Sequence, residues 1–170
     1  MNKKVLAAAF TSLFVALGFV GLSGAEVTGK GGPVITEVFA SKEIRGGQTW
    51  KVYMSASDPS NKMKYIYAEV QQPGGSYYIS MTRIRPENRK ELSGYIYLNT
   101  LGAMDFGTLK LVVHLGDGAG KFSEPAIFPL EFFPRAVQTS PPSGVFKEND
   151  LGPVMIQLRP VGIGGGGRPK

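Results

Sequence analysis

Apolar residues recur at every second position in several separate stretches of the chain, and this alternation constrains the fold more than any other feature. Residues 48–56 read QTWKVYMSA, residues 92–99 read LSGYIYLN and residues 108–116 read TLKLVVHLG. Successive side chains of a β-strand point to opposite faces of its sheet, so each stretch predicts a strand with one buried face. No part of 26–170 sustains a helical period, and we therefore expect an all-β protein.

Short turn signals separate the predicted strands. Glycine, proline, aspartate and asparagine cluster at 46–47, 58–61, 73–75 and 116–120, the residue types that favour tight turns. With further strands at 33–40, 65–70, 76–84 and 125–132, about seven short strands are expected. This pattern predicts an antiparallel β-sandwich of the immunoglobulin-like type. The last strand should lie at a sheet edge, because Pro125 and Pro129 cannot donate to a strand ladder.

The first 25 residues have the three parts of a secretory signal peptide. Lys3 and Lys4 give a basic start, residues 5–20 form an uncharged apolar run, and Ser23 and Ala25 are the small residues that precede a cleavage site. A retained membrane anchor is the alternative, but glycines dilute the apolar run. We expect cleavage before Glu26, no membrane span in the mature chain, and a secreted or periplasmic location.

Charge and cysteine content narrow the choice of partners. Removing Lys3 and Lys4 from the 19 basic residues leaves 17 against 13 acidic ones. This small excess of positive charge predicts no nucleic-acid binding, because such binding requires cations gathered on one face of the protein. The chain has no cysteine, so an exported protein of this sequence has no disulfide and no cysteine for a lipid anchor. The fold must rest on its own core.

The chain after Phe133 changes in character, and the sequence predicts a sandwich domain over 26–133 followed by a different region over 134–170. Residues 134–144 are rich in Pro and Ser and are typical of a linker. Residues 153–159 could form one more strand, with Val154, Ile156 and Leu158 on one face. The glycine-rich 161–170 is typical of a flexible tail. The extra strand should pair within the molecule, or else with a neighbouring subunit.

The polar residues of the chain do not favour an enzyme. His114 is the one histidine of the chain, and no other residues complete a Ser/His/Asp or Cys/His arrangement with it at a known spacing, so it is interpreted as a surface imidazole. One histidine without cysteine does not make a zinc site unless carboxylates supply the other ligands. Residues 116–121, GDGAGK, lack the first glycine and the final Ser or Thr of a phosphate-binding loop. We expect no cofactor and no catalytic residue.

A bound calcium ion is the one metal that the sequence leaves open. Loops 57–62 and 116–121 should emerge at the same end of a sandwich, which would bring together the oxygen-bearing side chains of Asp58, Asn61 and Asp117. Ca²⁺ takes about 6 to 8 oxygen ligands, and the usual calcium-loop pattern is absent. Asp and Asn are also common turn residues, which is the simpler interpretation.

Exposed aromatic and basic residues are the candidate binding groups. Strand alternation sends four tyrosines outward: Tyr65, Tyr67, Tyr95 and Tyr97. Such rings stack on sugars or fill protein interfaces, although cross-strand aromatic pairs also stabilise an ordinary sheet. A loop at 83–90 carries Arg83, Arg85 and Arg89, which suit an acidic polysaccharide or protein surface or form a solvated connection. The tyrosines form one platform only if their strands belong to the same sheet.

Two segments resemble bacterial immunoglobulin-like and fibronectin-type-III-like domains. Residues 54–70, MSASDPSNKMKYIYAEV, resemble a strand, an Asp-led loop and the next strand of these domains. Residues 107–123 resemble their closing hairpin, with matches at Gly107, Leu111, Val113, Asp117, Ala119, Gly120 and Ser123. The resemblance implies an extracytoplasmic module that binds or spaces other molecules.

Three functions are therefore expected, in order of preference. The first is a non-enzymatic binding or structural module of the cell envelope or extracellular space with a protein partner. The second is a carbohydrate-binding module that uses the exposed tyrosines and the arginine loop. The third is a subunit of an extracellular polymer that assembles by strand addition.

Overall fold

A computed structural model describes residues 31–73, 79–102, 107–156 and 158. These residues form an all-β fold with a single short 3₁₀ helix, η1 (Pro86–Asn88), which confirms the predicted class. The strands are β1 (Val34–Ala40), β2 (Glu43–Ile44), β3 (Thr49–Ser57), β4 (Tyr65–Gln71), β5 (Ile79–Arg83), β6 (Glu91–Asn99), β7 (Thr108–Gly116), β8 (Ala126–Phe132) and β9 (Asp150–Pro153). The signal peptide and the glycine tail lie outside the described residues.

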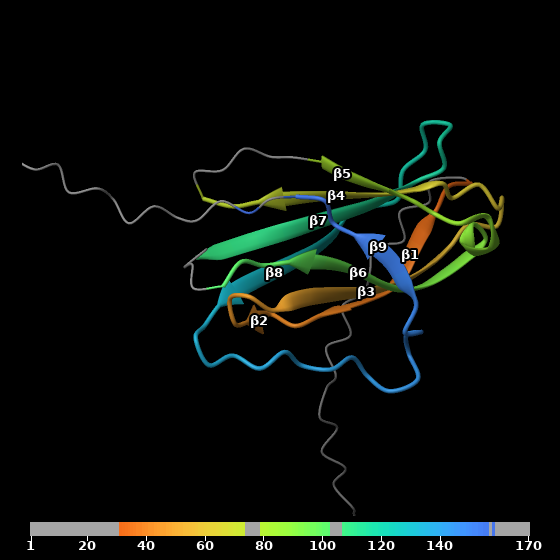
Figure 1. The fold of residues 1–170 in the computed structure, drawn as a ribbon. Coiled ribbons are helices and arrows are strands. Elements are labelled where there is room, and N and C mark those ends of the chain that lie inside the picture. Colours follow the sequence, from red (N-terminus) through yellow and green to blue (C-terminus); the bar gives the residue numbers. More distant parts are fainter. Residues whose placement is uncertain (1–30, 74–78, 103–106, 157, 159–170) are drawn as a thin grey trace, which may run out of the picture.

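The strands form two sheets with one core between them. The first sheet has the order β1-β3-β6-β9 and the second has the order β2-β8-β7-β4-β5. Strands β3, β6 and β9 lie in one layer and β4, β5 and β7 in the other (Figure 1). Inward-facing residues from both sheets form a single hydrophobic cluster, which is the arrangement that a β-sandwich requires.

Alternation along each strand explains which residues form this core. On β3, Trp50 and Met54 are fully buried, and on β7 the same is true of Leu111 and Leu115. The indole Nε1 of Trp50 donates a hydrogen bond to the carbonyl oxygen of Ser41 at 2.8 Å, so the ring is buried without an unpaired donor. The predicted inward faces of these strands are confirmed.

The alternation in 76–84 leaves the face assignment of strand β5 open, because Tyr77, Ile79 and Met81 compete with Tyr78, Ser80 and Ile84 for the inward side. Ser80 and Ile84 are buried, whereas Ile79 and Met81 are exposed. Tyr77 and Tyr78, which competed for the same assignment, lie outside the described residues. The two exposed apolar residues therefore stand on the outer face of the second sheet.

Two strand pairs are parallel, which corrects the expectation of a purely antiparallel sandwich. Strand β2 pairs in parallel with the end of β8, and β9 pairs in parallel with β6. Parallel neighbours need a long crossover connection, and both pairs join segments that are far apart in the sequence. The short β2 is the edge strand beside β8, but it pairs only with Glu131 and Phe132, so among the described residues Pro129 has a strand neighbour on one side only, as the predicted edge position requires.

Residues 134–149, here called the strap, lie against the outer face of the first sheet instead of forming a linker (Figure 1). Gln138 accepts a hydrogen bond from the backbone nitrogen of Lys51 at 3.0 Å and donates one to the carbonyl of Thr49 at 3.0 Å. The backbone nitrogen of Lys147 donates to Ser93 Oγ at 3.2 Å. A composition rich in Pro and Ser suits a strap, because it crosses the sheet without needing ladder partners.

The extra strand occupies Asp150–Pro153, before the predicted 153–159, and pairs within the molecule. Val154 and Leu158 are buried in the core and Met155 is exposed, so the predicted inward face holds, although residues 154–156 are not part of a strand. The segment also joins the two sheets at one edge of the fold. Thr82 Oγ1 donates to the carbonyl of Pro153 at 3.2 Å, and the nitrogen of Met155 donates to Ser80 Oγ at 2.8 Å.

Candidate functional site

The two tyrosine pairs lie on opposite sides of the fold. Tyr95 and Tyr97 are on β6 of the first sheet, and Tyr65 and Tyr67 are on β4 of the second sheet. Ile96, between Tyr95 and Tyr97, and Ile66, between Tyr65 and Tyr67, point into the core. The four rings therefore cannot form one binding platform, and each outer face has to be considered separately.

The strap covers the aromatic cluster on the first sheet. Tyr53 lies between the inward-facing Val52 and Met54 on β3 and therefore faces outward, but it is only 5% exposed. Its ring lies 5.7 Å from that of Phe146 in the strap and 5.4 Å from that of Tyr95. The ammonium group of Lys51 lies 4.0 Å from the centre of the Tyr95 ring. This face already has an occupant from the same chain.

A carboxylate fixes the strap to this cluster. Glu148 accepts a hydrogen bond from the Tyr53 hydroxyl at 3.0 Å and pairs with Lys51 Nζ at 3.2 Å. These two hydrogen bonds lower the pKa of Glu148. Burial together with the hydrogen bond to Glu148 raises the pKa of Tyr53. Burial is the largest single effect on Lys51 and lowers its pKa, but the hydrogen bond to Glu148 and the electrostatic interactions with Tyr53, Glu148 and Tyr95 together outweigh it and raise the pKa.

The outer face of the second sheet, here called the tyrosine face, remains open among the described residues. The strand registers order its side chains in rows, of which three carry the exposed apolar and aromatic residues; a further row, Gln71, Lys110 and Pro129, lies beyond Glu69. The three rows are Ile79, Glu69, Val112 and Ile127; then Met81, Tyr67 and His114; then Arg83, Tyr65, Gly116 and Phe122. Ile79 is 69% exposed, and Met81, Ile127 and Phe122 are between 57% and 59% exposed. A sheet face with this much exposed apolar surface is a candidate interaction site.

The aromatic rings of the tyrosine face pack against one another in tilted pairs. The Tyr67 ring lies 5.5 Å from Phe122 at 59° and 5.9 Å from Tyr65 at 58°. Gly116 makes room for this packing, because a Cβ there would lie 2.7 Å from Tyr67 Cε2. The rings are thus held in place, but they are not coplanar.

The hairpin that carries Phe122 is fixed by two buried polar side chains. Asp117 accepts hydrogen bonds from the backbone nitrogens of Ala119 at 2.7 Å and Lys121 at 3.0 Å, and these bonds lower the pKa of Asp117. Ser123 Oγ accepts a hydrogen bond from the nitrogen of Leu115 at 2.9 Å. The loop is therefore pre-organised before any partner binds.

The calcium candidates are near one another but already serve their own loops. Asp58 is fully buried and accepts hydrogen bonds from the nitrogens of Ser60 and Lys62, both at 2.9 Å. Burial acts to raise the pKa of Asp58, but the hydrogen bonds outweigh it and lower the pKa. Asn61 is exposed, with a φ of 55° that suits a turn. Among the described residues, no group of three or more His, Asp or Glu side chains is arranged to hold a metal ion.

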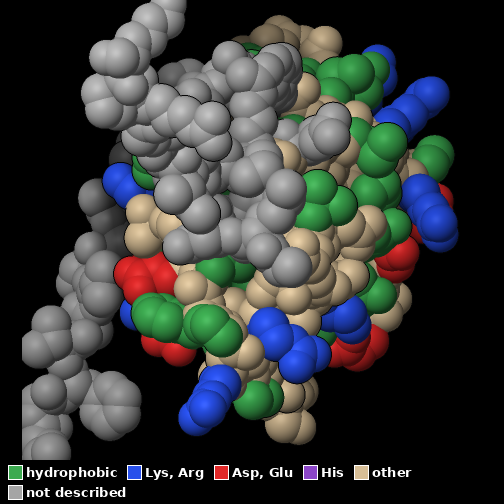
Figure 2. Space-filling view, turned by 60° about the vertical axis from the view of Figure 1, so that its left-hand side comes forward, with side chains coloured by type: hydrophobic (Ala, Val, Ile, Leu, Met, Phe, Trp, Pro, Cys, Tyr) green, Lys and Arg blue, Asp and Glu red, His purple; other side chains and the backbone are tan. Residues whose placement is uncertain are grey.

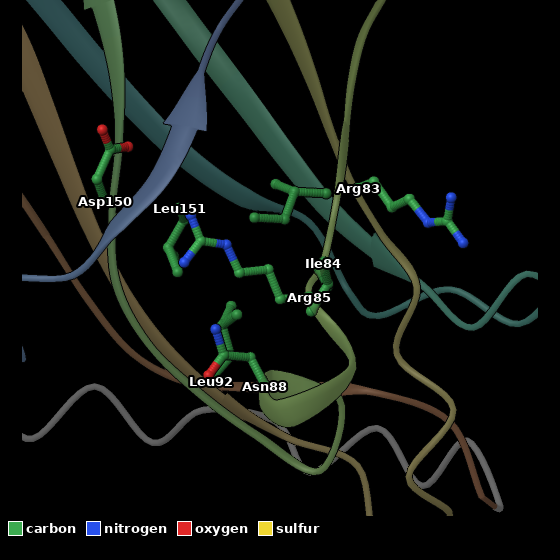
Figure 3. A pocket seen from close by; sticks show the side chains of 8 residues that line it. Arg83, Ile84, Arg85, Asn88, Leu92, Asp150 and Leu151 are labelled. Atoms are coloured by element: carbon green, nitrogen blue, oxygen red, sulfur yellow. The ribbon is translucent and has the colours of Figure 1, made fainter.

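The arginine loop does not gather its cations. Arg83 points away from the small cavity beside η1, whereas Arg85 extends toward Leu151 (Figure 3). The cavity has a volume of about 10 Å³, which is room for no more than a water molecule. The Nε atom of Arg89 is buried and has no hydrogen-bond partner among the described residues. Of the three arginines, Arg83 belongs to the tyrosine face.

A hollow of about 650 Å³ lies on the tyrosine face. Its lining residues are Tyr67, Glu69, Ile79, His114, Phe122, Ser123, Glu124 and Pro125. The His114 ring faces the carbonyl oxygen of Ser123 at 3.5 Å, so it belongs to this face. The lining combines exposed apolar groups with two carboxylates.

Charge is mixed over the surface. On the face that Figure 2 draws, basic and acidic side chains are interspersed among hydrophobic ones, and neither sign forms a continuous field. Among the described residues, no helix is long and apolar enough to cross a membrane.

Comparison with known proteins returned no relatives: no family model, no curated protein and no solved structure matches this chain.

The binding residues predicted from the sequence do not include four apolar residues of the tyrosine face: Ile79 and Met81, whose direction the sequence leaves open, and Phe122 and Ile127. Their signal was present but weak. Ile127 and Phe128 follow Ala126 at the start of β8. Consecutive strand residues face opposite sides of the sheet, so one of these two bulky side chains must face outward. Phe122 ends a turn, so no alternation predicted its direction.

Proposed function

We propose that this chain is an exported, non-enzymatic, immunoglobulin-like module of the cell envelope or extracellular space, and that it binds a protein partner through the tyrosine face. The observation that supports this most directly is the exposure of Ile79, Met81, Phe122 and Ile127 around two tyrosines. Protein interfaces combine an apolar and aromatic centre with a charged rim. Here Arg83 and Glu124 supply charges at opposite flanks of the face.

The ring geometry favours a protein over a sugar as partner. A sugar ring stacks best on an aromatic surface that is flat, and the rings of Tyr65, Tyr67 and Phe122 are tilted by 58–59° to their neighbours. Aliphatic side chains at the flanks give the face a shape that suits packing against other side chains. Each well-packed anchor residue of such an interface typically contributes at least about 1 kcal/mol.

The test is capture of partners from envelope extracts by tagged protein that starts at Glu26, with identification by mass spectrometry. Met81→Asp and Ile127→Asp each place a charge on the tyrosine face and should abolish capture. Val137→Asp is the matched control, because Val137 is 81% exposed on the strap. Capture that survives both face variants, with melting temperatures unchanged, would refute the proposal.

Carbohydrate binding is the second candidate function, and the hollow on the tyrosine face favours it. Aromatic rings and carboxylates, here Tyr67, Phe122, Glu69 and Glu124, are the groups that hold a sugar by stacking and by hydrogen bonds to its hydroxyls. A glycan array probed with mature protein and with Tyr67→Ala tests this function. Saccharide binding that Tyr67→Ala removes would favour it over a protein partner.

A further inference from the structure

The tyrosine face is self-complementary, and we propose that a second copy of this chain binds there face to face about a two-fold axis. This inference rests on the proposed function and names its partner. The axis would run parallel to the strands, between β4 and β7. Such a rotation exchanges β4 with β7 and β5 with β8 of the other copy, so one set of contacts is made twice.

The register supports this axis by matching apolar residues with apolar residues. Ile79 and Ile127 occupy the two ends of one row, on either side of Glu69 and Val112. The rotation therefore places Ile79 of each copy against Ile127 of the other. The exposed apolar side chains of the face lie on its two flanks, which is the distribution that this symmetry needs.

The same rotation matches charges. Arg83 ends the third row on the β5 side, and Glu124 follows Phe122 on the β8 side. Exchange of β5 with β8 brings Arg83 of each copy toward Glu124 of the other, and it also brings Tyr67 toward His114. Within one molecule Arg83 and Glu124 cannot meet, because β4 and β7 separate them by roughly 14 Å, or three strand spacings.

The size of the face sets the strength of the association. Four strands spaced by about 4.8 Å and five residues along each strand cover roughly 19 by 17 Å. This is roughly 320 Å² on each copy, well below the about 800 Å² per partner that standard stable interfaces bury. We therefore expect a reversible dimer whose population depends on concentration. A closed two-fold pair uses each face once, so it does not grow into a polymer.

Sedimentation velocity of the protein starting at Glu26, over a concentration series, tests the proposal. Arg83→Glu and Glu124→Arg should each raise the dimer dissociation constant by about fivefold or more, since each change creates two repulsive contacts. The double variant Arg83→Glu with Glu124→Arg should restore the wild-type value to within about twofold. Rescue of this kind requires contact between two molecules.

The matched control combines Arg83→Glu with Glu87→Arg, which has the same net charge as the double variant but changes an acid on η1, away from the face. It should not restore association. A wild-type protein that stays monomeric, or a charge swap that stays as weak as the single variants, overturns the dimer. Loss of envelope partners on Met81→Asp in a monomeric protein would then leave the proposed function standing.

Discussion

Replacing Gly94 by alanine should destabilise the protein through a single added carbon atom. Gly94 is buried on β6, where a Cβ would lie 2.9 Å from Leu151 Cγ and in closer conflict with the carbonyl oxygen of Asn149. That carbonyl accepts a hydrogen bond from the nitrogen of Tyr95 at 2.9 Å. The strap end and β9 can therefore relieve the conflict only by giving up their contact with β6.

The expected cost follows from two opposing effects. Overpacking of a well-packed site costs about 1–3 kcal/mol. Alanine in place of glycine in a strand would otherwise stabilise by roughly 0.5–1 kcal/mol, because the unfolded chain loses freedom. We expect the steric cost to prevail, since the conflicting atom belongs to the backbone and cannot rotate away. The net loss should be about 1–2 kcal/mol.

Urea unfolding measured by fluorescence is a suitable assay, because the chain has one tryptophan and Trp50 is fully buried. Gly102→Ala is the control: a Cβ there meets no atom within 4 Å, so its effect should stay within about 0.5 kcal/mol. A neutral or stabilising effect of Gly94→Ala would mean that residues 149–151 do not pack on β6, which would contradict this position of the strap end and β9.

Three further predictions concern the core, the stability of the fold at acid pH and the export of the protein. Trp50→Ala should cost about 3–5 kcal/mol of unfolding free energy, measured by circular dichroism, and a loss under about 1 kcal/mol would contradict its burial. Because the folded pKa of Asp58 lies below its ordinary value of 3.8, its stabilising effect is complete above that value and is lost as pH falls through the folded pKa. Melting temperatures between neutral pH and pH 2 should therefore fall less steeply for Asp58→Asn, and parallel curves would argue against this role. Mass spectrometry of exported protein should find Glu26 at the N-terminus, and an intact Met1 would contradict cleavage.

The sequence was sufficient to predict seven of the nine described strands, but it did not predict β2, placed β9 too late in the chain, and did not predict the surroundings of the strands. Alternation at Trp50, Val52 and Met54 places these residues inward because a half-buried strand has no other stable arrangement. The same alternation places Tyr53 outward, which is correct, but it contains no information about what covers that face. Burial of Tyr53 depends on Phe146, which is about 90 residues away and belongs to a segment without a period.

The candidate site was predictable in part for the same physical reason. Tyr65 and Tyr67 were found because β4 alternates regularly. Their separation from Tyr95 and Tyr97 depends on the sheet to which each strand belongs, and sheet membership is set by long-range pairing that no local pattern records. Likewise, Asp117 caps its own loop because its carboxylate accepts hydrogen bonds from two backbone nitrogens. A calcium ligand would need that oxygen to be free.

Site-specific photo-crosslinking in intact cells tests the central claim most directly. A photoreactive amino acid in place of Met81 would report contacts of the tyrosine face, and one in place of Val137 would report contacts of the strap. Both positions are exposed. We predict protein adducts from position 81, with a second copy or with another envelope protein, and none from position 137. Adducts from position 137 alone, or from neither position in properly exported protein, would contradict the claim that the tyrosine face is the binding surface.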